Sequence, residues 1–201
     1  MRKLTVNMSV TLDGVIQAPG RPDEDLRGGF QHGGWAKPYF DPVMFSSAAE
    51  GMAAMPDLLF GRRTYQDFYS VWPNRTDNPF TEVLDNSKKY VASKTLKEPL
   101  PWVNSALLSG DAATTVAALK EQPGKDLVIL GSAELVQSLM RANLIDDLIL
   151  SIHPLVLGSG RRLFPEGSPL TALRLVDSKI ASTGVVIATY QPAGHMPGKA
   201  S

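Results

Sequence analysis

An apolar run meets a glycine and two arginines, where a helix should begin, in the stretch Leu58-Leu59-Phe60-Gly61-Arg62-Arg63-Thr64-Tyr65. The apolar run predicts a buried strand, and the residues after it predict a helix. A helix N-terminus carries unsatisfied N–H donors and positive partial charge, and guanidinium groups bind phosphate oxygens. The stretch therefore predicts a phosphate site, with a nucleotide as the natural ligand. The alternative is an ordinary strand, turn and helix in which Thr64 is the N-cap.

The composition limits the classes of function. The chain has 201 residues, 43% of them hydrophobic, which fits one domain better than two. Its 20 basic and 20 acidic residues cancel, so no net charge drives binding to nucleic acid or anionic lipid. The chain has no cysteine, and its three histidines lack metal-ligand spacing, so we expect no bound metal. The N-terminal residues show neither a signal segment nor a membrane span, which predicts a cytoplasmic protein.

Hydrophobic patterns predict alternating strands and helices, an α/β chain. We expect strands at 4–12, 57–60, 88–93, 127–130 and 147–157, followed by an antiparallel pair at 173–176 and 185–190. Helices are expected at 42–55, at 64–69, at 111–121 with Ser109 or Asp111 as cap, and from Gly131-Ser132 to Ala142. Residues 17–38 hold eight glycines and prolines and predict a long functional loop. The domain is expected to span 1–191, with a frayed tail at 192–201.

Two strand-to-helix junctions are the candidate ligand site. Gly61-Arg62-Arg63-Thr64 follows one predicted strand, and Gly131-Ser132-Ala133-Glu134 follows another. In an open, mostly parallel sheet both junctions lie at the carboxyl edge, where ligands bind. The second junction has only one glycine of the G-x-G-x-x-G fingerprint, so a standard Rossmann domain is not predicted. The sequence therefore indicates a different dinucleotide-binding fold.

Five motifs carry a resemblance that spans nearly the whole chain. They are Ser9–Ile16, Leu59–Tyr65, Val91–Lys94, Ile129–Leu135 and Pro154–Gly160. In order and spacing they resemble the dihydrofolate-reductase-like superfamily, and most of all the reductase domain of the riboflavin-biosynthesis deaminase-reductase and its single-domain relatives. The resemblance implies a three-layer α/β/α fold whose central, mostly parallel sheet has about eight strands and an antiparallel C-terminal edge.

The resemblance also implies NADPH as the hydride donor. In the relatives, the first junction contacts the adenosine 2′-phosphate and pyrophosphate, the end of the third predicted strand contacts the adenine-ribose side, and the second junction cradles the pyrophosphate. The backbone beside Asp13-Gly14 passes the nicotinamide. Carried over, the cofactor residues are Val10, Ile16, Gly61, Arg62, Arg63, Thr64, Ser93, Lys94, Leu130, Gly131, Ser132, Ala133, Glu134 and Leu135.

The substrate half of the site is less defined by the sequence. Trp35, Tyr39 and Phe40 offer aromatic faces to a flat substrate, or they anchor their own loop. Asp41 and His153 are further substrate candidates, and a structural role is the alternative for His153. Asp13-Gly14 is also a common turn signal. The proton donor is open between Asp13, Asp41, Glu50 and water, with Asp13 or water favoured.

The predicted function is an NADPH-dependent reductase that transfers a hydride to a small, flat heterocycle, pyrimidine-like or pterin-like, or to a carbonyl compound. It is related to 5-amino-6-(5-phosphoribosylamino)uracil reductase. The carboxylate that folate reductases carry in the helix before the second strand falls near Phe45 here, so folate is not the expected substrate. The alternative is a non-catalytic NADP(H)-binding protein on the same fold. The apolar strand at 147–157, and the riboflavin-type relatives, predict a homodimer.

Overall fold

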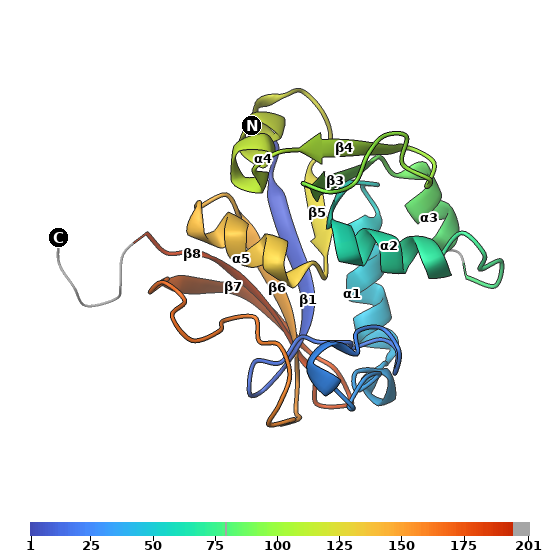
Figure 1. Cartoon of the computed structure of the whole chain (residues 1–201). Helices are drawn as coiled ribbons and strands as arrows, with labels where there is room; N and C mark the ends of the chain where they lie inside the picture. The colour runs from blue at the N-terminus through green and yellow to red at the C-terminus, as the bar shows by residue number, and fades with distance from the viewer. Residues whose placement is uncertain (79, 195–201) are drawn as a thin grey trace. The chain divides into compact units, whose positions relative to one another are not determined.

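The computed structural model describes residues 1–78 and 80–194 (Figure 1). The strands are β1 Leu4–Thr11, β2 Asp57–Gly61, β3 Lys89–Ser93, β4 Ser105–Ser109, β5 Leu127–Leu130, β6 Asp147–His153, β7 Leu173–Ile180 and β8 Val186–Pro192. The α-helices are α1 Pro42–Met52, α2 Arg62–Val71, α3 Phe80–Asn86, α4 Ala112–Glu121 and α5 Ala133–Arg141. The loop at 17–38 contains one 3-10 turn, Arg27–Gly29, and leads into a second, Lys37–Tyr39.

The strands form one sheet in the order β4-β3-β2-β5-β1-β6-β8-β7. β2 pairs in parallel with both β3 and β5, and β3 pairs in parallel with β4. β8 pairs antiparallel with both β6 and β7. The predicted α/β fold, a mostly parallel sheet with an antiparallel C-terminal edge and helices around it, is confirmed.

Contacts divide the chain into two compact units. Unit 1 comprises residues 1–6 and 48–145, and unit 2 comprises residues 7–47 and the chain from 146. The prediction of a single domain over 1–191 stays a prediction. Most of the predicted tail, residues 195–201 with His195, lies outside the described residues. In the part of the chain that the structure describes, no helix is long and apolar enough to cross a membrane.

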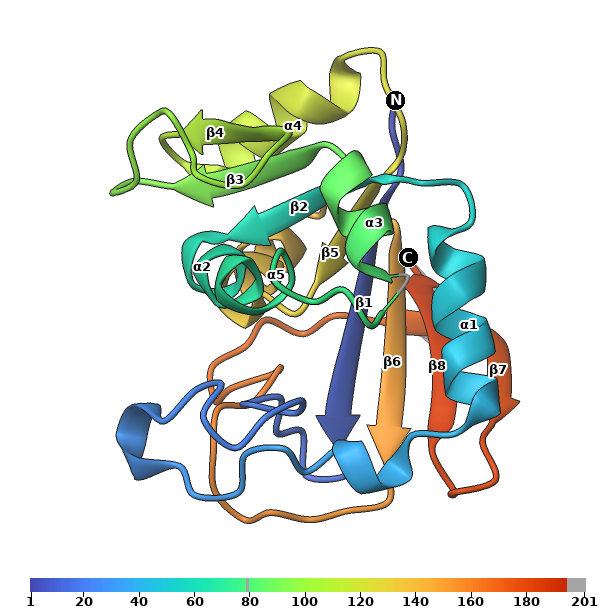
Figure 2. The same ribbon diagram turned by 90° about the vertical axis from the view of Figure 1, so that its right-hand side faces the viewer.

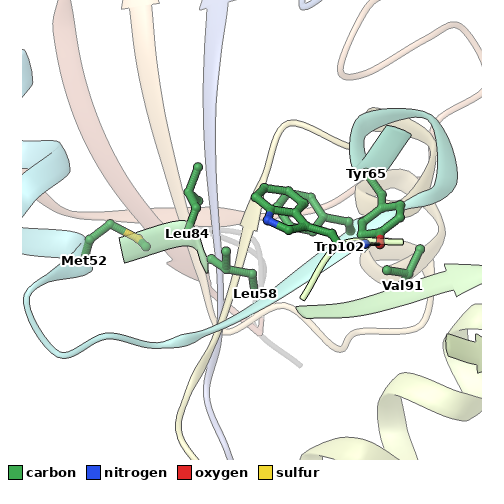
Figure 3. Close-up of a cluster of buried hydrophobic side chains, with 7 residues drawn as sticks. Met52, Leu58, Tyr65, Leu84, Val91 and Trp102 are labelled. Carbon is green, nitrogen blue, oxygen red and sulfur yellow. Dashed lines mark hydrogen bonds between the residues drawn. The ribbon is translucent and has the colours of Figure 1, made fainter. Parts of the chain in front are cut away.

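The core of unit 1 is built on β2, whose Leu58, Leu59 and Phe60 are completely buried. An uninterrupted apolar strand is what a parallel strand covered on both faces requires. On one face Leu58 and Phe60 join Val91, and the helices α1, α2 and α3 contribute side chains that pack with Trp102 (Figure 3). This packing fixes the C-terminal end of β2, which is where α2 begins.

Two expectations for unit 1 need correction, and the structure decides between the two predicted caps of α4. α2 begins at Arg62 with Gly61 as its N-cap, so the alternative in which Thr64 is the N-cap is wrong. β4 and α3 were not expected, because Ser105–Ser109 is half-exposed and Phe80–Asn86 has only seven residues, too few for a clear period. The α4 cap is Asp111, whose carboxylate accepts the Thr114 N–H.

Unit 2 contains the antiparallel edge, with β6, β8 and β7 in succession (Figure 2). β6 ends at His153 rather than at residue 157, because Pro154 has no N–H to continue the ladder. β7 reaches Ile180, beyond the predicted end at 176, and carries a bulge between Leu175 and Asp177. Helix α1, which is shared by the two units, ends at Met52 instead of residue 55.

Lys89 is a completely buried cation in unit 1. Its Nζ donates to the carbonyl oxygens of Leu84 at 2.6 Å, Ser87 at 2.9 Å and Asp85 at 3.3 Å, and it lies 4.7 Å from the Trp102 ring centroid. Burial lowers the pKa of Lys89 to about 8. The ammonium group therefore satisfies the carbonyls of Leu84 and Ser87, which have no other donor among the described residues. The Asp85 carbonyl, in contrast, also accepts from the Asn104 side chain.

We expect Lys89→Met to lower the free energy of unfolding by about 1–3 kcal/mol, because the carbonyls of Leu84 and Ser87 lose their donor. Urea denaturation monitored by circular dichroism measures this change. Lys97→Met is the control, since Lys97 is exposed and its replacement should change stability by less than about 0.5 kcal/mol. Equal stability of the two variants would show that the ammonium group contributes nothing to the fold.

Candidate functional site

The C-terminal ends of β3, β2 and β5 lie next to one another in unit 1, because these strands are parallel neighbours. The end of β2 leads into α2 at Arg62, and the end of β5 leads through Gly131 and Ser132 into α5. The structure therefore brings together the two junctions that the sequence singled out. Their helix N-termini present N–H donors at the same edge of the sheet.

Two reciprocal hydrogen bonds join the helix starts. The Gly61 N–H donates to the Ser132 hydroxyl at 3.0 Å, and the Ser132 N–H donates to the Thr64 hydroxyl at 3.1 Å. Each hydroxyl thus accepts a backbone N–H and keeps its own O–H proton as a donor. Neither donates that proton to any residue that the structure describes. The junction therefore presents two oriented hydroxyl donors that require an acceptor.

The chain turns sharply between β5 and α5 through two successive left-handed residues. Gly131 has φ 67°, and a Cβ there would lie 3.5 Å from the Thr64 methyl group. Ser132 has φ 58° and ψ 47°, a conformation that a non-glycine residue adopts at a cost of about 1–2 kcal/mol. Local strain of this kind is concentrated at binding sites, where the surrounding structure holds it in place.

The two arginines differ in their partners. Arg62 is half-buried and forms no ion pair with any described residue. Arg63 Nη1 lies 2.9 Å from a carboxylate oxygen of Glu134, with both side chains about half exposed. An exposed ion pair contributes at most about 1 kcal/mol, so a multiply charged anion can replace Glu134 as the partner of Arg63.

The two residues predicted for the adenosine side lie at the end of β3. The buried Ser93 hydroxyl accepts the N–H groups of Thr95 and Leu96, and so closes the turn. Lys94 is exposed. Hydrogen bonds from Thr114, and then the charge of Lys94, lower the pKa of Asp111. Ser93 therefore shapes this end of the strand, while Lys94 supplies a cation.

Asp13 lies in unit 2 and closes the turn after β1. Its carboxylate accepts hydrogen bonds from the Thr11 hydroxyl at 2.6 Å and from the N–H groups of Gly158 at 2.9 Å and Leu157 at 3.2 Å. The Thr11 hydroxyl first, and then these N–H groups, lower the pKa of Asp13. A carboxylate held in this way is ionised at neutral pH and has no proton to give, so the geometry favours a turn-fixing role over proton donation.

Asp41 likewise has a structural position. Its carboxylate accepts the N–H of Met44 at 3.0 Å, which caps α1, and the N–H and hydroxyl of Ser182 at 2.7 and 2.9 Å. The Met44 N–H first, and then Ser182, lower the pKa of Asp41. The residue is 6% exposed, so the predicted substrate contact is not accessible on its side chain.

Trp35, Tyr39 and His153 come together in unit 2. The Trp35 and Tyr39 rings meet the His153 imidazole edge to face, at centroid distances of 5.0 and 5.5 Å. Trp35 is 7% exposed and its indole N–H donates to the Gln17 carbonyl oxygen at 2.7 Å. Of the two roles that the sequence left open for Trp35, this burial favours the loop anchor over substrate stacking. Phe40 has an exposed ring.

Val10 and Ile16 are buried, so only their backbones could contact a ligand. Sequence reasoning missed Gln17, which organises the loop after β1. Its side-chain amide donates to the carbonyls of Asp25 and Arg27, and its side-chain oxygen accepts the Arg161 N–H. A single glutamine after an apolar strand carries no periodic signal, so nothing in the sequence could have shown this role. Among the described residues no cluster of histidine and carboxylate side chains could hold a metal ion.

The chain belongs to the RibD C-terminal domain family, whose model matches residues 2–187. Two proteins of Bacillus subtilis (strain 168), the uncharacterized proteins YyaP and YwjB, are similar in sequence. YyaP is 31% identical over 196 residues, which cover 94% of either chain. YwjB is 43% identical over 183 residues, which cover 89% of this chain and 91% of YwjB.

Solved structures share the fold at low sequence identity. A putative riboflavin biosynthesis protein from Shewanella sp. PV-4 has a TM-score of 0.71 and 22% identity, covering 96% of this chain and 99% of its own. Dihydrofolate reductase from Enterococcus faecalis, complexed with NADP(H) and RAB-propyl, has a TM-score of 0.59 and 16% identity, covering 95% and 96%. The predicted resemblance is confirmed: the family model shows the family, and the solved structures share the dihydrofolate-reductase-like fold.

We expect Asp13→Asn to lower the free energy of unfolding by about 1–2 kcal/mol at neutral pH, because an amide accepts fewer N–H groups than a carboxylate. The pKa of Asp13 is lower in the folded chain than its ordinary value of 3.8. Its contribution is therefore present above that pH and is lost as the pH falls through the folded-state pKa. The stability difference between the wild type and the variant should shrink below about pH 4.

Urea denaturation at several pH values measures this difference. Asp23→Asn is the control, since the Asp23 carboxylate is 78% exposed. A stability difference that stays constant down to the acid limit would contradict the assignment of Asp13 as a turn-fixing carboxylate.

Proposed function

We propose that the protein is an NADPH-dependent oxidoreductase that transfers a hydride to a small, flat heterocyclic or carbonyl substrate. The observation that supports the proposal most is the junction of α2 and α5 in unit 1. There two hydroxyl donors, two helix N-termini and the arginine Arg62 present donors and positive charge without an acceptor among the described residues. A pyrophosphate is a ligand of matching chemistry, because it accepts hydrogen bonds and carries negative charge.

Different residues of the chain would hold different parts of NADPH. The Ser132 and Thr64 hydroxyls and the N–H groups at the start of α5 would hold the pyrophosphate. Arg62, Arg63 and Lys94 would hold the 2′-phosphate, because guanidinium binds phosphate oxygens in pairs and lysine adds a point charge. When bound, NADPH supplies the hydride, and the protein contributes orientation and electrostatics.

The proton that accompanies hydride transfer is assigned to solvent. Asp13 and Asp41 each accept several hydrogen bonds and have lowered pKa values, so neither carries a proton near neutral pH. Of the two proton donors that the sequence favoured, Asp13 and water, water therefore remains. A second candidate function is a non-catalytic NADP(H)-binding protein. The hydrogen bonds that give Asp13 and Asp41 structural roles favour it, because these two acids would then take no part in catalysis.

Two measurements test the proposed function. Isothermal titration calorimetry with NADPH tests the cofactor site, and NADPH oxidation across a panel of pyrimidines, pterins, quinones and aldehydes tests the chemistry. Binding with turnover of one class supports the reductase and identifies its substrate class. Binding without turnover of any class supports the second candidate. Absence of NADPH binding would overturn both.

We expect NADPH to bind more tightly than NADH by a few kcal/mol at most, roughly the strength of one or two charge-assisted contacts. Arg62→Ala should weaken NADPH more than NADH, because only NADPH carries the 2′-phosphate. Arg63→Ala should have the smaller effect, since Arg63 must first leave Glu134. Arg75→Ala is the control, because Arg75 packs on Trp72 away from the junction. Equal affinity of the wild type for both cofactors would contradict the assignment.

We propose that the protein is a homodimer, with a revised contact surface. The sequence placed the contact on 147–157, but β6 lies between β1 and β8, and its Leu148 and Leu150 are buried. The exposed apolar side chains lie instead on the edge strand β7, at Leu175, Val176 and Ile180. Such side chains on an edge strand are unusual in a monomer.

Sedimentation at micromolar concentration should give a dimer for the wild type and a monomer for Ile180→Asp, because a buried carboxylate opposes association. Val156→Asp is the matched control: Val156 is 66% exposed in the same unit but lies outside β7, and the variant should stay dimeric. A monomeric wild type would remove the claim, and a dimeric Ile180→Asp variant would exclude this surface.

A further inference from the structure

His153 is a histidine at the end of β6 with one ring nitrogen that has no partner. The residue is 0% exposed. Its Nδ1 lies 2.9 Å from the Ser151 carbonyl oxygen, which can only accept, so Nδ1 carries the proton and donates. Nε2 then holds a lone pair, and it finds no hydrogen-bond partner among the described residues. Such a nitrogen is unusual, because nearly all buried polar atoms have a hydrogen-bond partner.

The loop from Gln17 to Tyr39 contacts this imidazole through two aromatic rings. Trp35 contacts the ring at a centroid distance of 5.0 Å and an interplanar angle of 89°, and Tyr39 contacts it at 5.5 Å and 86°. Each contact is fixed to the fold, because the Trp35 indole donates to Gln17 and the Tyr39 carbonyl accepts the Thr183 hydroxyl. The conformation of the loop is therefore coupled to the state of one side chain.

Among the described residues, none of the groups that act on His153 is a charged side chain. From β6 it meets the Ser151 carbonyl, from β1 the Val10 carbonyl, and from the loop the indole of Trp35 and the phenol of Tyr39. Burial lowers the pKa of His153, and the two carbonyls oppose this effect. No carboxylate compensates a positive charge here, so an imidazolium in the closed arrangement would lack both solvation and a counter-ion.

We propose that His153 is a proton-sensitive latch: the neutral imidazole holds the 17–39 loop closed through Trp35 and Tyr39, and protonation of its buried Nε2 releases the loop. The protonated ring carries a charge that needs hydration, and this need is met when the aromatic rings move away and water enters.

The direction and size of the effect follow from linkage. Opening restores the ordinary pKa of histidine, near 6.5, so the open form binds protons more readily than the closed form. The closed arrangement is therefore fully favoured above about pH 6.5 and weakens as the pH falls. With one proton taken up, the ratio of open to closed chains rises by at most about tenfold per pH unit, until the closed-state pKa is reached.

The consequence for ligand binding rests on the proposed function. The latch and the loop belong to unit 2, together with the residues predicted for the substrate, whereas the residues proposed for the pyrophosphate belong to unit 1. Acid would therefore loosen the loop without displacing the residues proposed for the pyrophosphate. The latch itself needs neither ligand, so it can be tested on the protein alone.

Hydrogen exchange of the backbone amides of residues 17–39, between about pH 5 and pH 8 and corrected for intrinsic rates, tests the latch. In the wild type, protection should fall by up to about tenfold per pH unit below about pH 6.5. In His153→Gln the amide still donates to Ser151 but cannot titrate, so protection should not vary with pH. His32→Gln is the matched control, because His32 is exposed in the same loop and its loss should leave the wild-type pH dependence.

A second measurement applies if His153→Gln does not fold. Proton NMR of the wild-type imidazole Cε1–H should show His153 titrating within the pH range in which loop protection is lost. The latch is overturned if loop protection is constant with pH, if the pH dependence survives in His153→Gln, or if His153 titrates outside the pH range in which protection is lost. None of these results bears on NADPH binding, so the proposed function stands or fails separately.

Discussion

The reciprocal hydrogen bonds between the starts of α2 and α5 are the constraint on which the candidate cofactor site depends. Ser132 accepts from Gly61 and donates to Thr64, so one residue fixes the separation of two helix N-termini. Its left-handed backbone stores strain that the parallel pairing of β2 with β5 sustains. Donors that are held in place before a ligand arrives lose little freedom on binding, so this arrangement favours the binding of an anion.

Unit 2 uses its ionisable side chains differently. Asp13 and Asp41 each collect several N–H or O–H donors and so fix a turn and a helix cap. His153 is buried under the aromatic rings of the loop instead. In a reductase the cofactor carries the hard chemistry, so the protein does not need a dedicated acid of its own. Carboxylates that fix backbone and a solvent-derived proton are consistent with this division.

Cofactor recognition and substrate recognition would rely on different kinds of groups. Cofactor recognition relies on backbone N–H groups at helix starts, which any sequence with the right junctions provides. Substrate recognition relies on side chains from a long loop, and here Trp35 packs inward while Phe40 stays exposed. The position near Phe45, where folate reductases carry a carboxylate, is an exposed phenyl ring in this chain. Folate chemistry therefore has no support in the structure.

Local signals in the sequence, hydrophobic period and glycine, predicted most of the strands and helices in order, the buried strands β2 and β5, and the two glycine junctions. It missed β4 and α3, whose short segments carry too little pattern, and it extended β6 past Pro154. Only the tertiary structure decided which side chains meet: Ser132 with Thr64, Asp13 with Gly158, and His153 with Trp35. These pairs are distant along the chain, and neither spacing nor composition encodes a contact that packing alone creates.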